Sequence, residues 1–204
     1  MRTDRRKMIR PSSLPTSYEM LEYIENTSTA YIDCGLKPKH TFDYEIKYEV
    51  NTYTASPILS CKMDYNSDKD YFYLFNSGLS AIFNVGSKQL VLDIKTGMPI
   101  YIKFGNYFIE NLVEEEKSTE VIFDEKMNGA IITNLFLFAL LETSGQEEPF
   151  ISKGKIWLLN INDNGKPIRK FIPVKRKSDG MIGMYDLVGR KFYTSPNGVA
   201  FTGG

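Results

Sequence analysis

Histidine, cysteine and tryptophan are scarce in this sequence, and the shortage limits the chemistry that its side chains can perform. The 204 residues include one histidine, His40, and two cysteines, Cys34 and Cys61. The usual serine or cysteine triad takes its base from a histidine, but His40 lies in a predicted turn, where we expect a surface side chain. One histidine and two distant cysteines also fall short of the four ligands of a structural zinc site. The sequence therefore predicts no catalytic residue, no metal and no cofactor.

The two cysteines leave two states open. Cys34 and Cys61 could pair in an oxidising compartment, or they could be buried free thiols. A disulfide framework normally has more cysteines at closer spacing, so we expect free thiols.

Long apolar runs are missing as well. The first residues, MRTDRRKMIRPSS, are basic but lead into no apolar segment, so we do not expect a secretory signal. The most apolar stretch, Leu135–Leu141, is far shorter than the roughly 20 residues of a membrane-spanning helix. We expect no membrane insertion, and a protein that stays in a cytoplasm or leaves it by assembly or lysis.

The chain has no net charge, because 25 Lys and Arg residues balance 25 Asp and Glu residues. That balance gives no overall attraction to nucleic acid or to an anionic membrane. Positive charge is concentrated in residues 1–13, which we predict to be an arm preceding one domain at residues 14–204. We expect the arm to bind carboxylates of a partner by charge-assisted hydrogen bonds; a solubilising tail is the alternative. Its basic residues are Arg2, Arg5, Arg6, Lys7 and Arg10.

Aromatic residues, by contrast, are plentiful and follow the period of β-strands. Tyr and Phe number 13 each, which suits pleated sheets. Apolar and charged residues alternate through Phe42–Val50, as in a strand with one buried face. We see no convincing amphipathic helix. Other predicted strands are Ile58–Cys61, Tyr71–Phe75, Ala81–Val85, Leu90–Ile94, Ile100–Phe104, Tyr107–Leu112, Glu120–Phe123 and Leu135–Ala139.

The strongest turn signal lies between Lys155–Asn162 and Pro167–Arg176. These runs flank Asn164-Gly165, and an Asn-Gly pair between two apolar runs is typical of a β-hairpin. Residues 156–159 are apolar on both faces, as expected of a central strand. Many short strands separated by turns predict a sandwich or a barrel.

Three acidic residues are candidates for glycoside hydrolysis. Asp43, Glu45 and Glu49 alternate along one predicted strand, as the paired acids of some glucanases do. However, Lys47 interrupts the row and the opposite face is the more apolar one. We therefore expect these acids to face solvent without a catalytic role.

A calcium site is a second possibility for oxygen ligands. The run Asp64–Asp70 offers Asp or Asn at alternating positions, and such oxygens are the ligands that calcium prefers. The glycine and the bidentate glutamate of an EF-hand are missing, and Lys69 adds a competing charge. We expect a polar hairpin loop there.

Two groups of side chains could contact a glycan, although each also has a structural interpretation. A basic cluster could bind an anionic glycan or could be the solvent face of a strand. Four tyrosines near predicted loops could stack on sugar rings or belong to the core. The groups are Lys170, Lys175, Arg176 and Lys177, and Tyr53, Tyr65, Tyr71 and Tyr73.

Two segments at opposite ends of the chain carry a family resemblance. Phe171–Thr194 reads FIPVKRKSDGMIGMYDLVGRKFYT, with short strands joined by turns at Ser178-Asp179-Gly180 and at Gly189. Residues 14–35 contain LPTSY, LEYIENT and AYIDCG, which read as an opening strand pair. Together these segments resemble the laminin-G/concanavalin A-like jelly-roll domain that is common in phage tail and fibre proteins and in gut-bacterial surface proteins.

The resemblance implies an all-β fold, a two-sheet antiparallel jelly-roll sandwich with a short basic N-terminal arm. Jelly rolls commonly bring the chain ends together, so we expect the strand near Tyr18–Ile24 to lie close to the strand near Val199–Thr202. The fold alone does not decide function, because it carries lectins, glycosidases and inert modules alike.

The function that we expect is a non-enzymatic structural or attachment role in a bacteriophage particle, as a fibre, tail or capsid-associated jelly roll. Such a virion protein assembles in the host cytoplasm and needs no secretion signal. Its expected partners are other virion subunits in an oligomeric assembly, reached through the arm, and a cell-surface glycan. The alternative is a carbohydrate-binding module of a bacterial surface protein; a glycoside hydrolase is disfavoured because paired acids are not evident.

Overall fold

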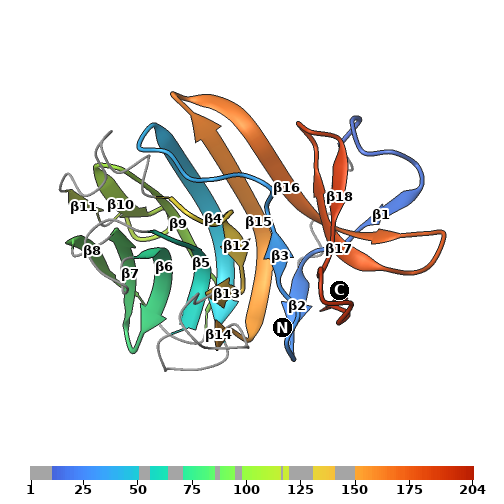
Figure 1. Ribbon diagram of the computed structural model, residues 1–204, viewed down its shortest axis with the longest axis horizontal. Coiled ribbons are helices and arrows are strands. Elements are labelled where there is room, and N and C mark those ends of the chain that lie inside the picture. The colour runs from blue at the N-terminus through green and yellow to red at the C-terminus, as the bar shows by residue number, and fades with distance from the viewer. Residues whose placement is uncertain are drawn as a thin grey trace.

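The computed structural model describes residues 11–50, 56–63, 71–85, 88–94, 98–115, 117–119, 131–140 and 150–204. Within these ranges the regular elements are all β-strands, without a helix. Two large antiparallel sheets pack face to face (Figure 1). The predicted all-β, two-sheet jelly-roll sandwich is confirmed.

The larger sheet has eleven strands and contains both ends of the described chain. Its central hairpin is closed by Asn164 and Gly165, whose φ angles of 47° and 74° are those of the tight turn that Asn-Gly favours. In spatial order the main path is β11 (Lys117–Thr119), β10 (Phe108–Asn111), β9 (Ile100–Gly105), β4 (Phe42–Val50), β15 (Gly154–Asp163), β16 (Lys166–Arg176), β17 (Ile182–Asp186) and β18 (Lys191–Tyr193). Beside this path, β1 (Tyr18–Met20) pairs with β16, and β2 (Ile24–Asn26) pairs with β15 and β19 (Thr202–Gly203).

The smaller sheet has six strands, and a two-stranded ribbon lies next to it. The predicted strand Leu135–Ala139 is divided between sheet and ribbon, because buried Phe138 has a φ of 65° and breaks the pleat. The sheet order is β3 (Ile32–Asp33), β12 (Phe136–Leu137), β5 (Ser56–Lys62), β6 (Tyr71–Ser77), β7 (Ser80–Val85) and β8 (Lys88–Asp93), and the ribbon joins β13 (Ala139–Leu140) to β14 (Phe150–Ile151).

Aromatic rings fill the space between the two sheets. The Tyr44 ring stacks on the Phe104 ring with centroids 4.9 Å apart and planes inclined by 13°. From the smaller sheet, Phe72 packs 5.6 Å from Tyr44 and Phe83 packs 4.7 Å from Phe104. All four side chains are completely buried. The alternation read in Phe42–Val50 therefore holds, with the apolar residues of β4 facing the core.

Both cysteines are buried free thiols, as predicted. Burial raises the pKa of Cys34 and of Cys61 well above the usual range of a thiol. Neither side chain is therefore poised as a nucleophile.

An early strand and the last strand of the described chain pair with each other, which confirms the predicted proximity of the N- and C-terminal strands. Thr202 pairs with Glu25, and Gly203 pairs with Ile24. The amide N–H of Tyr23 also donates to the carbonyl oxygen of Gly204 at 3.1 Å. The C-terminal strand thus covers an edge of β2 that would otherwise offer unpaired backbone groups.

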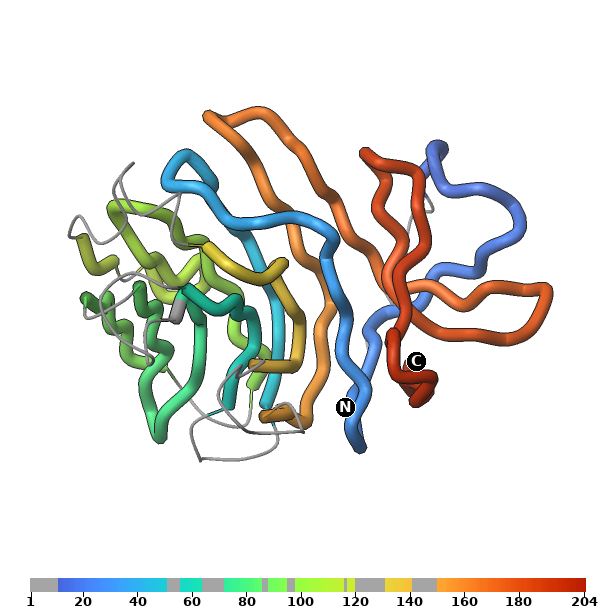
Figure 2. Tube along the Cα trace, viewed as in Figure 1, coloured from blue at the N-terminus to red at the C-terminus, as the bar shows by residue number. Residues whose placement is uncertain are grey.

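Strand β16 continues beyond the sandwich and carries a second, smaller core. Figure 2 shows this extension of β16, together with β1, β17 and β18, at one end of the molecule. Leu14, Val174 and Tyr185 are buried together there, and Tyr18 packs 4.9 Å from Tyr185. The N-terminal residues of the domain are therefore fixed on the C-terminal hairpins.

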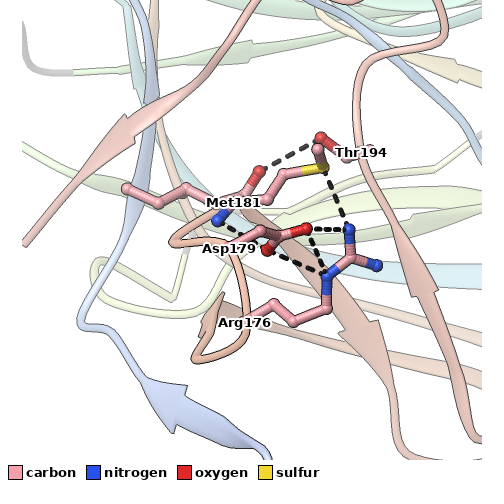
Figure 3. Close-up of polar contacts among 5 residues, drawn as sticks. Arg176, Asp179, Met181 and Thr194 are labelled. Carbon is pink, nitrogen blue, oxygen red and sulfur yellow. Dashed lines mark hydrogen bonds and ion pairs between the residues drawn. The ribbon is translucent and has the colours of Figure 1, made fainter.

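The turn from β16 to β17 is held by a charged pair (Figure 3). The Arg176 guanidinium donates from Nε and Nη2 to the Asp179 carboxylate at 2.6–3.1 Å, and it also lies 4.9 Å from the Phe192 ring centroid. Gly180 takes a φ of 73°, as the predicted turn requires. These contacts give Arg176, Asp179 and Gly180 a structural role within Phe171–Thr194, one of the two segments that carry the family resemblance.

Several predictions fall outside the described residues. They are the basic arm at Arg2, Arg5, Arg6, Lys7 and Arg10, the oxygen-rich run Asp64–Asp70, the tyrosines Tyr53 and Tyr65, and the strand Glu120–Phe123. Within the described part of the chain, no helix is long and apolar enough to cross a membrane.

Candidate ligand-binding face

One face of the larger sheet points away from the core, and we call it the outer face. On β4 it carries the four charged residues that alternate with the buried ones. Strands β9, β10 and β15 add residues that lie directly opposite these in the pairing register, so they share the face. The outer face includes Asp43, Glu45, Lys47, Tyr101, Lys103, Phe108, Trp157, Asn160 and Asn162.

Glu45 is the centre of a polar network on this face. It accepts a hydrogen bond from the Tyr101 hydroxyl at one carboxylate oxygen and from the Asn160 amide at the other, the latter at 3.2 Å. Burial and the neighbouring Glu45 raise the pKa of Tyr101 to about 12. The phenol therefore stays protonated at neutral pH and remains a donor to Glu45.

A second network lies two residues away, at Asp43. Its Oδ1 accepts a hydrogen bond from the Asn162 amide at 2.8 Å and lies 3.7 Å from the Lys103 ammonium. The Lys103 ammonium in turn lies 5.7 Å from the centroid of the Phe108 ring. An amide, a carboxylate, an ammonium group and an aromatic ring thus follow one another across the four strands β15, β4, β9 and β10.

Trp157 reaches the outer face because of a β-bulge. The pairing of β15 with β4 shifts between Ile156 and Leu158, so Trp157 is the extra residue, and bulges commonly redirect a side chain in this way. Its ring lies 5.6 Å from the Tyr23 ring and 5.3 Å from the Lys47 ammonium. Trp157 is half-buried and is the only tryptophan of the chain.

A surface depression of about 290 Å³ lies at the start of β4. Three turns form its wall: the turn before β4, the β9–β10 turn and the β15–β16 turn. Tyr107 stands at the rim of the depression and is 58% exposed. Asp43 also lines the depression and belongs to the outer face, so the two are continuous. Other lining residues are His40, Asn106, Phe108 and Asn164.

The sequence identified the acids of β4 but not their neighbours. Asp43, Glu45 and Glu49 do lie away from the core, as predicted, although they are half-buried rather than fully solvated. Two of them are also bound by side chains from other strands. The sequence shows Trp157 only as part of an apolar central strand, and no local signal places it on the surface.

The remaining predicted contacts are dispersed. His40 lies in a turn, as expected, and is half-buried, where it lines the depression. Lys170, Lys175 and Lys177 are exposed, which fits the solvent face of a strand, and Arg176 is occupied by Asp179. Tyr73 packs 4.7 Å from Phe75 on the smaller sheet, away from the outer face.

A metal centre is not formed by the described residues, since no three His, Cys, Asp or Glu side chains among them come together as possible ligands. The outer face can instead bind by stacking and hydrogen bonding. Its aromatic rings offer apolar surfaces with polar rims, and its amides and carboxylates offer donors and acceptors close by.

No protein-family model and no curated protein matches the chain. Among solved structures, the chain is similar to the crystal structure of Scytalido-glutamic peptidase with a peptide-based transition-state analogue. The identity is 12%, the alignment covers 87% of this chain and 98% of that chain, and the TM-score is 0.35. A similarity at this level carries no argument about what the present chain does.

Proposed function

We propose that this chain is a non-enzymatic attachment or structural protein that contacts glycans through the outer face of its larger sheet. The observation that carries the proposal is the position of Trp157, which a bulge turns onto that face beside Tyr23. The two networks centred on Glu45 and Asp43 lie next to it on the same strands.

This combination suits a sugar better than a protein or a nucleic acid. A pyranose ring has a face of C–H groups that packs on an aromatic ring, and a rim of hydroxyls that donate and accept hydrogen bonds. Trp157 supplies the aromatic surface, and Asn160 and Glu45 supply polar groups of both kinds. A nucleic acid would instead require a concentrated positive surface, whereas β4 alternates Asp43, Glu45 and Glu49 with a single Lys47.

The absence of catalysis is part of the proposal, and the state of the two acids supports it. A glycosidase needs one carboxyl group that gives up a proton and a second that attacks or activates water. Here Glu45 uses both oxygens to accept hydrogen bonds, and Asp43 is held by Asn162 and Lys103. Because each carboxylate acts as an acceptor here, neither serves as the proton donor that such a pair needs.

The biological setting that we propose rests on the resemblance of the two chain ends to phage tail and fibre jelly rolls. In this setting the chain is part of a virion that assembles in the host cytoplasm. The basic arm at residues 1–13 binds neighbouring virion subunits, and the outer face contacts the cell-surface glycan. A carbohydrate-binding module of a bacterial surface protein would use the same face.

The binding part of the proposal is tested by titrating the protein with a panel of soluble oligosaccharides. Because Trp157 is the only tryptophan, the intrinsic tryptophan fluorescence reports directly on this face. We expect at least one oligosaccharide to shift the emission, and Trp157→Ala to weaken its binding in calorimetry by about tenfold. Phe150→Ala is the matched control, since Phe150 is an exposed aromatic on the two-stranded ribbon; it should bind normally. Oligosaccharide binding by Trp157→Ala that is as tight as that of the parent protein would overturn the proposed face.

The non-enzymatic part is tested by reducing-end release from the same panel. We expect no turnover by the parent protein. Turnover that disappears in Asp43→Asn or Glu45→Gln, with folding intact, would show that the face is an active site.

A further inference from the structure

The depression at the start of β4 has a floor without a side chain. Gly105 lies opposite Asp43 on one side and opposite Phe108 on the other. A Cβ at position 105 would stand 3.4 Å from the Asp43 Cβ and 3.4 Å from the Phe108 ring. The same Cβ would lie 3.3 Å from the Phe42 carbonyl oxygen, so a side chain here would crowd all three groups, and the glycine lets them pack closely at the base of the depression.

The size of the depression limits what it can hold. Its volume of about 290 Å³ is just below the range of about 300–1,000 Å³ in which drug-sized ligands bind. A single sugar ring is a suitable occupant. The exposed Tyr107 ring at the rim offers a surface for stacking, and Asp43 retains acceptor capacity, because its two contacts both fall on Oδ1 and a carboxylate has about four acceptor sites.

The charges of the outer face indicate a neutral ligand. In the pairing register, Lys103 lies opposite Glu45 and Glu110, and Lys155 lies opposite Glu25 and Glu49. Acids and lysines are thus interspersed and equal in number among the described residues of this face, so these residues have no net charge to attract a charged ligand. Among the described residues, the face carries five acids and five lysines: Glu25, Asp43, Glu45, Glu49 and Glu110, and Lys47, Lys103, Lys117, Lys155 and Lys170.

The depression and Trp157 lie along the same strand. Four residue steps, about 14 Å in a β-strand, separate Asp43 at the depression from Lys47, whose ammonium lies 5.3 Å from the Trp157 ring. The network centred on Glu45 lies between them. A short oligosaccharide laid along β4 would reach both ends.

We propose that the depression binds one neutral pyranose, the end ring of a glycan whose following rings lie along β4 toward Trp157. This inference rests on the proposed glycan-binding function. It adds the direction in which the glycan lies on the face, a subsite for the end ring of the glycan and the class of sugar that binds there. Tyr107 stacks on the end ring, Asp43 accepts from its hydroxyls, and Trp157 stacks on a later ring.

The test compares single sugars with chains. Glucose, galactose, mannose and N-acetylglucosamine are the neutral probes, and glucuronate and galacturonate are the anionic ones, each followed by saturation-transfer NMR. We expect one or more neutral sugars to bind, and Tyr107→Ala to abolish that signal while Trp157→Ala leaves it intact. For the corresponding oligosaccharide, we expect each variant to weaken binding in calorimetry by about tenfold, the effect of losing roughly 1.4 kcal/mol of stacking.

Tyr107→Phe provides the matched control, because it keeps the ring and should retain most of the affinity. Tyr107 is exposed, so its removal should leave the melting temperature unchanged. Normal binding of sugar and oligosaccharide by Tyr107→Ala, or binding of uronates as tight as that of neutral sugars, would overturn the inference while leaving the Trp157 face in place. If no sugar binds the parent protein at all, the proposed function itself fails.

Discussion

The Trp157 ring lies 5.6 Å from the Tyr23 ring, with the two planes inclined by 52°. This contact joins a central strand to the N-terminal part of the domain. Tyr23 is held in turn by Gly204, which accepts its backbone N–H, and by the pairing of β19 with β2. The closure of the chain ends therefore supports one side of the outer face as well as the edge of the sheet.

The C-terminal closure is expected to contribute substantially to stability through Phe201. This side chain is 3% exposed and packs 5.9 Å from the Phe138 ring. Replacing a buried Phe by Ala costs about 3–5 kcal/mol, so Phe201→Ala should lower the free energy of unfolding in urea by an amount in this range. Thr202→Ala, at the neighbouring exposed position, is the control and should change it little. Equal stabilities of the two variants would contradict the role of Phe201 in the core.

Close backbone contact between β4 and β15 depends on Gly154. A Cβ at this position would overlap the carbonyl oxygen of Glu49, so Gly154→Ala would force the two strands apart. We expect a loss of about 3 kcal/mol, at the upper end of overpacking effects. Gly165→Asn is the control, because nothing lies near its Cβ and Asn tolerates the positive φ of this turn. Chemical denaturation of both variants is the measurement, and a stable Gly154→Ala protein would show that the strands can separate without cost.

The sequence predicted local geometry well, because local geometry follows from short-range rules. The alternation of Phe42–Val50 and the turn at Asn164-Gly165 both need only neighbouring residues, and both are confirmed. The bulge at Trp157 was not predicted, because a one-residue shift in register leaves no mark in an apolar run. It depends on how β15 pairs with β4.

The candidate site was less predictable for a similar reason. Glu45 was visible as an acid on a strand, but its partners Tyr101 and Asn160 come from distant parts of the chain. Only the strand order of the sheet brings them together. The three turns that form the depression also come from distant parts of the chain. No local sequence pattern shows that they lie side by side.

The turn between β16 and β17 should contribute to stability in a pH-dependent way. Hydrogen bonds from Arg176 and from the Met181 backbone hold the pKa of Asp179 below its usual value of 3.8. Because the folded-state pKa is depressed, the stabilisation is complete above that usual value and is lost as the pH falls through the folded-state pKa. The pair is exposed to solvent, so the effect should be small.

Thermal unfolding of the parent and of Asp179→Asn, from about pH 7 to about pH 2, measures this contribution. The difference between the two midpoints should be constant at neutral pH and should shrink toward zero at the acidic end. Asp163→Asn serves as the control, since it removes a carboxylate from the other hairpin turn without breaking the Arg176 pair. A difference that does not change with pH would mean that Asp179 acts through turn geometry rather than through its charge.

The two thiols should be inert in the folded protein and reactive once it unfolds. Cys34 and Cys61 are both completely buried, and burial raises the pKa of each well above the usual thiol range. Since the thiolate is the reactive form, a thiol reagent at mildly alkaline pH should label neither residue in the native state. In concentrated guanidinium without reductant, both of the 2 cysteines in the chain should be labelled, which mass spectrometry would count. Rapid labelling of the native protein would contradict the burial of the thiols, and an unlabelled denatured protein would reveal a disulfide in place of two free thiols.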